Sequence, residues 1–252
     1  MMGSSVTLMG DQILTHGIQY GIYVLEGVAC VLLASQGRWR RLKGLCLYVM
    51  LLFGLDGLAR SAVLNYFGWN SPQFRYFYWL TDVVLALGAF LLTCGFFRRA
   101  CAREDKLWRF VRLLLVFVFI LVVAISALVL TRHYSQVYRW FIVEFSQNLY
   151  FSCLVLNTLL YVMIQQLAID DEELGLLVCG MGVQFAGEAA FLALYHLTVG
   201  GTFAGVVASF LSPACTLGML LIWIYAIVRV PEAVPVHSQM ARQATLAEAV
   251  SD

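Results

Sequence analysis

Seven long apolar runs dominate the chain, and they constrain its fold more than any other feature of the sequence. A helix crosses a bilayer with about 20 mostly apolar residues, and each run is long enough. The runs span residues 11–35, 42–66, 73–98, 107–131, 136–167, 174–198 and 202–229. Because lipid offers no hydrogen-bond partner to an open strand edge, a helix is the expected element in each run.

The composition is typical of a membrane domain. The chain of 252 residues is 62% hydrophobic and only 12% charged, whereas a soluble domain has about a quarter of its residues charged. The sequence therefore predicts an all-α polytopic membrane protein, with a seven-transmembrane-helix bundle over residues 1–230. Residues 231–252 are expected to form a short, flexible cytoplasmic tail. No Lys or Arg precedes the first run, which is typical of a first span rather than of a cleaved signal peptide.

Basic residues fall unevenly on the two predicted sides of the membrane. Arg60 lies within the second run, and Arg75, Arg132 and Arg139 lie on one side. The other twelve of the sixteen Lys and Arg residues lie on the opposite side: Arg38, Arg40, Arg41, Lys43, Arg98, Arg99, Arg103, Lys106, Arg109, Arg112, Arg229 and Arg242. Cytoplasmic loops are rich in Lys and Arg. The N-terminus is therefore expected outside and the C-terminus in the cytoplasm.

One predicted cytoplasmic loop, "AIDDEELG", is acidic instead of basic. Acidic residues carry little weight in the charge rule, so the orientation stands. Asp170 and Glu173 have the spacing of a capping box, and negative charge suits a helix N-terminus. A helix cap is the favoured interpretation of this loop, and a docking site for a partner is the alternative.

Polar residues inside the apolar runs form the candidate site. Asp56 and Arg60 are four residues apart, so they share a helix face and are expected to pair. Counting about 1.5 Å per residue from the outer ends of the helices places the ionisable residues of four runs about 9–15 Å deep. The ligand- or ion-binding candidates are Asp56, Arg60, Asp82, Glu144, Asn148, Gln184 and Glu188. Glu26 is expected to lie deeper and apart from them.

Two interpretations of this layer compete. In the first, the acids line a cavity open to the outside that suits a cation, a proton or a cationic group of a ligand. In the second, two acids clamp Arg60, the other acids are protonated or hydrogen-bonded, and the layer only locks the bundle. The first is favoured because ionisable residues in a membrane are costly and usually functional. Glu188 is expected to be protonated, with Gln184 accepting its hydrogen bond.

Three further patterns concern helix packing. The segment "LLLVFVFILVVAISALVL" of the fourth run has no charge, so this helix is expected to be the most exposed to lipid. Pro213 is expected to kink the seventh helix because it removes a backbone hydrogen bond. The spacings "GIQYG" (Gly17 to Gly21) and "GTFAG" (Gly201 to Gly205) are expected to allow close contact between helices.

Catalytic, metal and cofactor sites are not indicated. His16, His133 and His196 fall near the predicted outer surface, but their spacing is not that of a zinc site. The last run has no lysine for a retinal Schiff base, and the chain has no C-x-x-C pair. No constellation of a nucleophile and a base emerges, so an enzyme is the weakest hypothesis. No cofactor, metal ion or nucleic acid is expected.

Three segments carry a resemblance to known proteins: "FRYFYWLTDVVLALGAF", "VEFSQNLYFSCLVL" and "QFAGEAAFLAL". With them, the chain from about residue 45 resembles an uncharacterised family of bacterial seven-helix membrane proteins, met mostly in acidobacteria. The family has no assigned activity, so the resemblance implies a fold and a bacterial inner-membrane location but no mechanism. The plan is also similar to the seven-helix input regions of some bacterial histidine kinases, although no kinase follows Arg229 here.

The first hypothesis for function is a receptor-like or sensory membrane module. It would bind a small ligand or ion in the outer half of the membrane and signal through a separate membrane or cytoplasmic partner, or through a second copy. One alternative is an accessory subunit of a larger membrane complex, in which the polar layer serves assembly. Another is a small transporter of protons or cations, although only one helix has a proline break and transporters commonly have a matching pair.

Overall fold

The computed structural model describes residues 3–35, 42–68, 71–102, 104–130, 137–167, 171–197 and 202–229. Side chains are described for residues 17–35, 42–68, 71–102, 104–128, 141–167, 171–191 and 210–229. These side chains do not include the predicted tail, Asp170, the three histidines or the "GTFAG" segment. The expectations for those residues therefore stay predictions.

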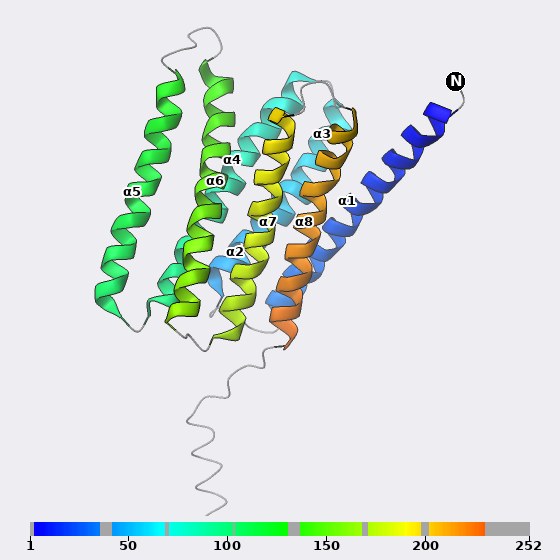
Figure 1. Ribbon diagram of the computed structural model, residues 1–252. Helices are drawn as coiled ribbons and strands as arrows, with labels where there is room; N and C mark the ends of the chain where they lie inside the picture. Colours follow the sequence, from blue (N-terminus) through cyan, green and yellow to red (C-terminus); the bar gives the residue numbers. More distant parts are fainter. Residues whose placement is uncertain are drawn as a thin grey trace, which may run out of the picture.

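Helices make up the whole of the described structure (Figure 1). They are α1 (Gly3–Ser35), α2 (Lys43–Leu52), the π-helix η2 (Phe53–Arg60), α3 (Ser61–Phe67), α4 (Pro72–Ala100), α5 (Asp105–Leu130), α6 (Val137–Gln166), α7 (Glu172–Leu197) and α8 (Thr202–Arg229). The segments α2, η2 and α3 follow one another as one span, Lys43–Phe67. In the described residues, seven spans are long and apolar enough to cross a membrane, which confirms the predicted all-α membrane bundle.

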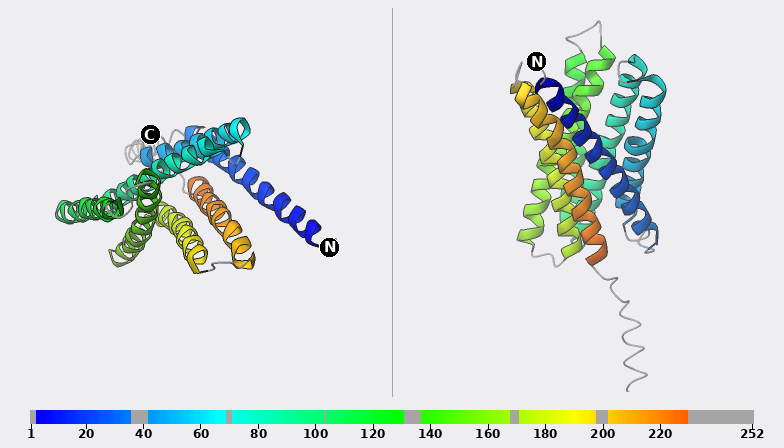
Figure 2. Two further views of the ribbon diagram at one scale, coloured as in Figure 1. Left: turned by 90° about the horizontal axis from the view of Figure 1, so that it is seen from above. Right: turned by 90° about the vertical axis from the view of Figure 1, so that its right-hand side faces the viewer.

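Six of the seven spans form a closed ring. Each of the neighbouring pairs α1–α2, α2–α4, α4–α6, α6–α7, α7–α8 and α8–α1 is in contact. Among the described residues, the seventh span, α5, packs against α6 and α4 alone, and it lies at the edge of the bundle (Figure 1). The N-terminal part of α1 leaves the bundle and diverges from the other helices (Figure 2).

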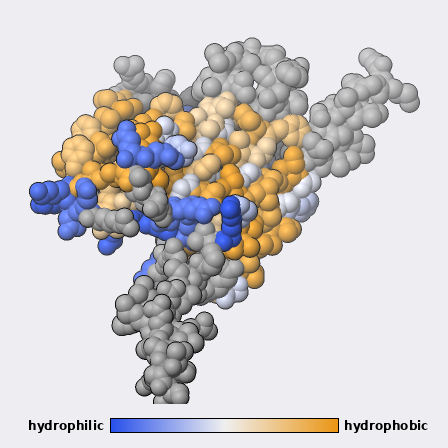
Figure 3. Space-filling model, turned by 60° about the horizontal axis from the view of Figure 1, so that its bottom comes forward, coloured by the Kyte–Doolittle hydropathy of each residue, from blue (hydrophilic) through white to orange (hydrophobic). Residues whose placement is uncertain are grey.

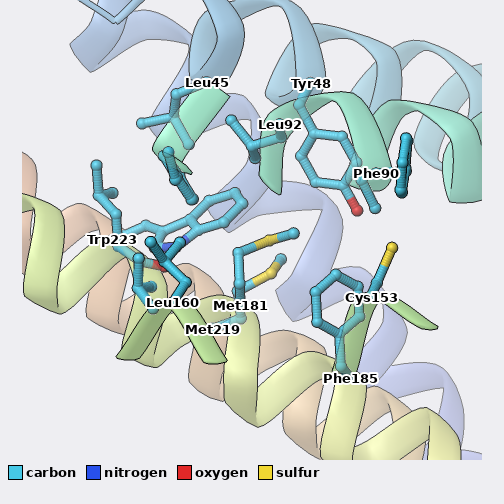
Figure 4. Packing of buried hydrophobic residues seen from close by; sticks show 14 of the residues in the cluster. Leu45, Tyr48, Phe90, Leu92, Cys153, Leu160, Met181, Phe185, Met219 and Trp223 are labelled. Carbon is cyan, nitrogen blue, oxygen red and sulfur yellow. The ribbon is translucent and has the colours of Figure 1, made fainter. Parts of the chain in front are cut away.

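Apolar side chains fill the interior of the ring. Tyr48 of α2 and Leu92 of α4 point inwards from one side, and Met181, Phe185 and Trp223 approach from α7 and α8 on the other (Figure 4). The indole of Trp223 also donates a hydrogen bond to the carbonyl of Leu177 at 3.0 Å. This polar contact fixes α8 against α7 within an otherwise apolar core, because a buried N–H group needs a partner.

Local sequence signals set the turn between α3 and α4. Gly68 ends α3 with a φ angle of 77°, a left-handed conformation that glycine adopts without steric cost. The Ser71 hydroxyl then accepts a hydrogen bond from the amide of Phe74 at 3.1 Å, and Pro72 occupies the first turn of α4. Both are favoured signals at a helix N-terminus. This turn brings Arg60 and the first turns of α4 to the same end of the bundle.

Two of the packing predictions have clear outcomes. Helix α5 has exposed large apolar side chains along its length, among them Phe110, Leu113 and Phe117, as expected for a helix that faces lipid. The predicted close contact at Gly17 and Gly21 is wrong, because a Cβ atom added at either glycine meets nothing within 4 Å. The close glycine contacts lie in α7 instead.

We call the end that holds the turn between α3 and α4 the Arg60 end, and the opposite end the Arg99 end. Hydrophilic residues gather around the Arg99 end, beside apolar flanks (Figure 3). Helix α8 is continuous through Pro213, and the predicted kink there stays a prediction.

Candidate functional site

Arg60 is the centre of a polar cluster between η2 and α4. Its Nη1 atom donates to Asp56 at 2.6 Å, and its Nε atom donates to the hydroxyl of Thr81 at 2.8 Å. Its Nη2 atom donates to the carbonyl of Tyr78 at 3.2 Å and lies 3.8 Å from a carboxyl oxygen of Asp82. We call these five residues the Arg60 cluster. The predicted pairing of Asp56 with Arg60 is confirmed.

The aromatic ring of Tyr78 completes the surroundings of the guanidinium. The central carbon of the Arg60 guanidinium lies 4.1 Å from the centre of this ring, within the range of a cation–π contact. The side chain of Arg60 is 11% exposed, whereas those of Asp56 and Asp82 are 31% and 28% exposed. The cation of the cluster is therefore enclosed, and its two carboxyl groups are the part that remains open.

Helix α7 brings a third carboxyl group towards the cluster. Glu188 lies within electrostatic range of Asp82, Asp56 and Arg60. The hydroxyl of Ser212 in α8 donates to its Oε1 atom at 2.6 Å, and the Nε2 atom of Gln184 donates to the same oxygen at 3.3 Å. The predicted contact between Gln184 and Glu188 is therefore present.

The hydrogen bond between Gln184 and Glu188 runs in the opposite direction to the predicted one. Gln184 was expected to accept from Glu188, but its amide donates, and its own Oε1 atom has no partner. Both contacts fall on the same carboxyl oxygen. Sequence reasoning missed Ser212, which reaches Glu188 from a neighbouring helix, and the protonation of Glu188 stays a prediction.

Glu144 and Asn148 make no described contact with the Arg60 cluster, and their role as candidate ligand-binding residues stays a prediction. Glu144 makes no hydrogen bond or ion pair with a described residue, and Asn148 donates to Ser126 of α5 at 3.2 Å. Residues four apart share a helix face, so both belong to the face of α6 that turns towards α5. Ser146 lies on a different face, and it is the residue of α6 within hydrogen-bonding reach of Asp82.

Glu26 lies closer to the cluster than its predicted separate position. It is fully buried in α1 and lies within electrostatic range of Asp56. A Cβ atom added at Gly57 would lie 3.3 Å from the Oε2 atom of Glu26. The absence of a side chain at Gly57 therefore lets the Glu26 carboxyl group approach η2 one residue after Asp56.

A second ionic cluster lies at the Arg99 end. Arg99 of α4 donates to both carboxyl oxygens of Asp171, at 2.8 and 2.9 Å, and to Glu173 at 2.7 Å. Asp171 also accepts from the amide of Leu174 at 3.1 Å, so it is the N-cap of α7. Glu173 of the predicted capping box is buried against Arg99, and the part predicted for Asp170 lies outside the described residues.

Sequence reasoning missed the two α4 residues that hold Arg60 from the side. Tyr78 and Thr81 are three residues apart, and Asp82 is four residues beyond Tyr78, so all three face η2. Their spacing was a usable signal. The π-helical form of residues 53–60 had no signal in the sequence, apart from the glycines at positions 54 and 57.

The Arg60 cluster offers acceptors rather than donors to a ligand. Every nitrogen of the Arg60 guanidinium is engaged with the protein. Asp56 and Glu188 each use one carboxyl oxygen in the described hydrogen bonds, which leaves the other oxygen available. Three carboxyl groups near one guanidinium favour a positively charged ligand. Among the described residues, no three His, Cys, Asp or Glu side chains lie close enough to hold a metal ion.

Comparison with known proteins gives no relative from which a function could be transferred. The chain matches no protein-family model, and neither a curated protein nor a solved structure is significantly similar to it. The resemblance to the bacterial seven-helix family therefore stays a prediction, and the functional argument depends on the geometry of the described residues.

Proposed function

We propose that the protein is a sensory module of the bacterial inner membrane that binds a small cation, or a cationic group of a larger ligand, at the Arg60 cluster. The N-terminus would lie outside and the C-terminus in the cytoplasm, so that the cluster opens to the outer side. The signal would pass to a separate membrane or cytoplasmic partner. The observation that carries this proposal is the set of partly exposed carboxyl groups around an enclosed and fully engaged Arg60.

The connection between the two ends of the bundle supports a sensor. Helix α4 carries Asp82 near one end and Arg99 at the other, and α7 carries Glu188 and the Arg99 partner Glu173. The two helices also touch each other across the ring. A ligand that changes the distance between Asp82 and Glu188 would therefore act on the same two helices that form the ion pairs at the Arg99 end.

Ligand binding at the cluster is tested with purified full-length protein in detergent. Sodium, calcium and methylammonium are suitable probes, and thermal melting is the readout because a ligand that binds the folded state stabilises it. At least one probe is expected to raise the melting temperature of the wild type. Asp82→Asn should lose this response because it removes an acceptor charge from the cluster.

The matched control for this experiment is Asp105→Asn. Asp105 is an exposed acid in the first turn of α5, remote from the cluster, so this variant should keep the response of the wild type. Equal responses of Asp82→Asn, Asp105→Asn and wild type would place binding elsewhere. No response to any of the three probes would contradict the choice of a cation as the ligand.

Topology is the second prediction. A reporter enzyme that works only in the cytoplasm should be active when it is fused after Asp252. An epitope placed before Met1 should be accessible from outside intact cells. The physical reason is the excess of Lys and Arg in the loops at the Arg99 end. The opposite result would turn the Arg60 cluster towards the cytoplasm and remove the proposed outside ligand.

A small cation or proton transporter is the second candidate. Transporters commonly bind their substrate where two membrane helices are interrupted. The π-helix η2 interrupts the second span beside Arg60, and Pro213 lies next to Ser212, which holds Glu188. Uptake of labelled sodium or methylammonium into proteoliposomes would favour transport, whereas binding without uptake would favour sensing.

A further inference from the structure

Glu26 is the most unusual ionisable residue in the described part of the chain. Its side chain is fully buried, and neither of its carboxyl oxygens has a hydrogen-bond partner. Two aromatic rings lie nearby, since an added Cβ atom at Gly57 would meet Tyr23 and Phe53 as well as the Oε2 atom of Glu26. No ion pair or hydrogen bond explains why an acid occupies this position.

A buried carboxyl group with no partner is not stable as an anion. Removing a charge from water is so costly that an isolated buried carboxyl group takes up a proton instead. The neutral acid is still costly while its O–H and C=O groups are unpaired, and such groups call for an explanation in a native structure. Ionisable residues in membrane spans usually mark a pathway for protons or ions.

The groups around Glu26 include one other acid. Helix α1 contributes Tyr23 and Cys30, α2 contributes Tyr48, and η2 contributes Asp56. Helix α8 also packs against α1, but its described residues have no charged side chain except Arg229 at the far end. Asp56 is the neighbour that also binds Arg60, so it connects Glu26 with the Arg60 cluster.

The π-helix η2 contains the residues that connect Glu26 with the Arg60 cluster. Residues 53–60 depart from the α-helical hydrogen-bond ladder, and π-helical turns within α-helices are frequent at functional sites. Asp56, Gly57 and Arg60 all lie in this segment. Gly57 leaves room for the Glu26 carboxyl group beside η2. The preceding residue of η2, Asp56, pairs with Arg60.

We propose that Glu26 is an internal proton-binding site that exchanges its proton with Asp56. In this exchange the O–H bond of the Glu26 carboxylic acid breaks and an O–H bond forms on the Asp56 carboxylate. Glu26 is an anion only briefly, because its buried site does not hold a charge, and the proton returns to it from Asp56; the total charge is unchanged throughout. A neutral Asp56 holds Arg60 less strongly, so the position of this proton alters the Arg60 cluster.

Infrared spectroscopy of the purified full-length protein in lipid nanodiscs at neutral pH tests the proton site. The wild type should show a carboxylic-acid C=O band at the high-frequency end of its range, as is typical of an acid without a hydrogen bond. Glu26→Gln should abolish this band, and Glu188→Gln should keep it. A spectrum that is unchanged in Glu26→Gln would overturn the proposal.

A pair of glycine variants in η2 tests the same site without removing the acid. Gly57→Ala places a Cβ atom 3.3 Å from the Oε2 atom of Glu26, whereas Gly54→Ala places one in open space. The band should therefore shift in Gly57→Ala and not in Gly54→Ala. This pair decides the assignment if Glu26→Gln does not fold, and an equal band position in both variants contradicts it.

The route of exchange is tested by transfer into heavy water. Replacement of the acid proton by deuterium lowers the frequency of the C=O band, so the rate of this shift measures exchange at Glu26. Asp56→Asn keeps an oxygen for Arg60 but cannot take up the proton, and it should slow the shift severalfold. A rate equal to that of the wild type would show that the proton does not pass through Asp56. Glu26 would hold its proton whether or not the Arg60 cluster binds a cation, so these results stand apart from the ligand-binding test.

Discussion

Arg60→Leu is expected to lower the free energy of unfolding by about 3 kcal/mol, at the low end of the cost of breaking a buried ion pair. The guanidinium makes three hydrogen bonds and one cation–π contact. Leucine replaces none of them and leaves Asp56 and Asp82 without their cation. The low end applies because both carboxyl groups are about 30% exposed. Thermal and urea unfolding of the purified protein in detergent measure the change.

Two further variants separate charge from geometry in this experiment. Arg60→Lys keeps the positive charge but cannot reach three separate acceptors with a planar group, so its loss of stability should fall between wild type and Arg60→Leu. Addition of Asp56→Leu to Arg60→Leu should recover part of the loss, because it removes one stranded acid. A double variant that is less stable than Arg60→Leu alone would show that Asp56 has another stabilising partner.

The seven spans and the pairing of Asp56 with Arg60 could be predicted from the sequence because both depend on short-range spacing. The length of an apolar run determines whether a helix can cross the membrane. A separation of four residues places two side chains on one face of a helix, and this relation survives in the π-helix η2. Neither property depends on how the helices pack against one another.

Which other residues reach the Arg60 cluster depends on how far each helix is rotated about its own axis. Counting residues gives the depth of Glu144, but its side chain shares the face of α6 that turns towards α5 through Asn148. Ser146 and Tyr150 are four residues apart on another face, and they are the α6 residues within electrostatic or hydrogen-bonding range of Asp82. Depth alone therefore does not determine which residues of α6 contact Asp82.

The position of Glu26 differs from its predicted one for a related reason. Its greater depth from the outer surface predicts a position apart from the cluster, but α1 crosses the bundle obliquely and passes η2 (Figure 2). A tilted helix carries a deep residue towards a shallower one on its neighbour. The glycine at position 57 then removes the side chain that would keep them apart. Neither the tilt nor the π-helix can be predicted from apolar run length.

The same dependence on packing explains why the close glycine contacts lie in α7. A Cβ atom added at Gly187 would lie 2.5 Å from the Cβ atom of Cys215, and one added at Gly180 would lie 2.7 Å from the indole nitrogen of Trp223. Both distances are shorter than any contact that two such atoms make. Helices α7 and α8 therefore approach one another as closely as they do because these two positions have no side chain.

Gly187→Ala is accordingly expected to destabilise the protein by about 1–3 kcal/mol, the usual cost of forcing an extra carbon atom into a packed interior. The clash lies against a Cβ atom, which cannot move unless the backbone of α8 moves. Gly175→Ala is the matched control on the same helix, since its added Cβ atom meets nothing within 4 Å, and alanine is the better helix former. It should be neutral or slightly stabilising. Cys215→Gly should restore much of the stability of Gly187→Ala by making room for the new methyl group. Equal melting temperatures for Gly187→Ala and Gly175→Ala would mean that α7 and α8 are farther apart in the membrane.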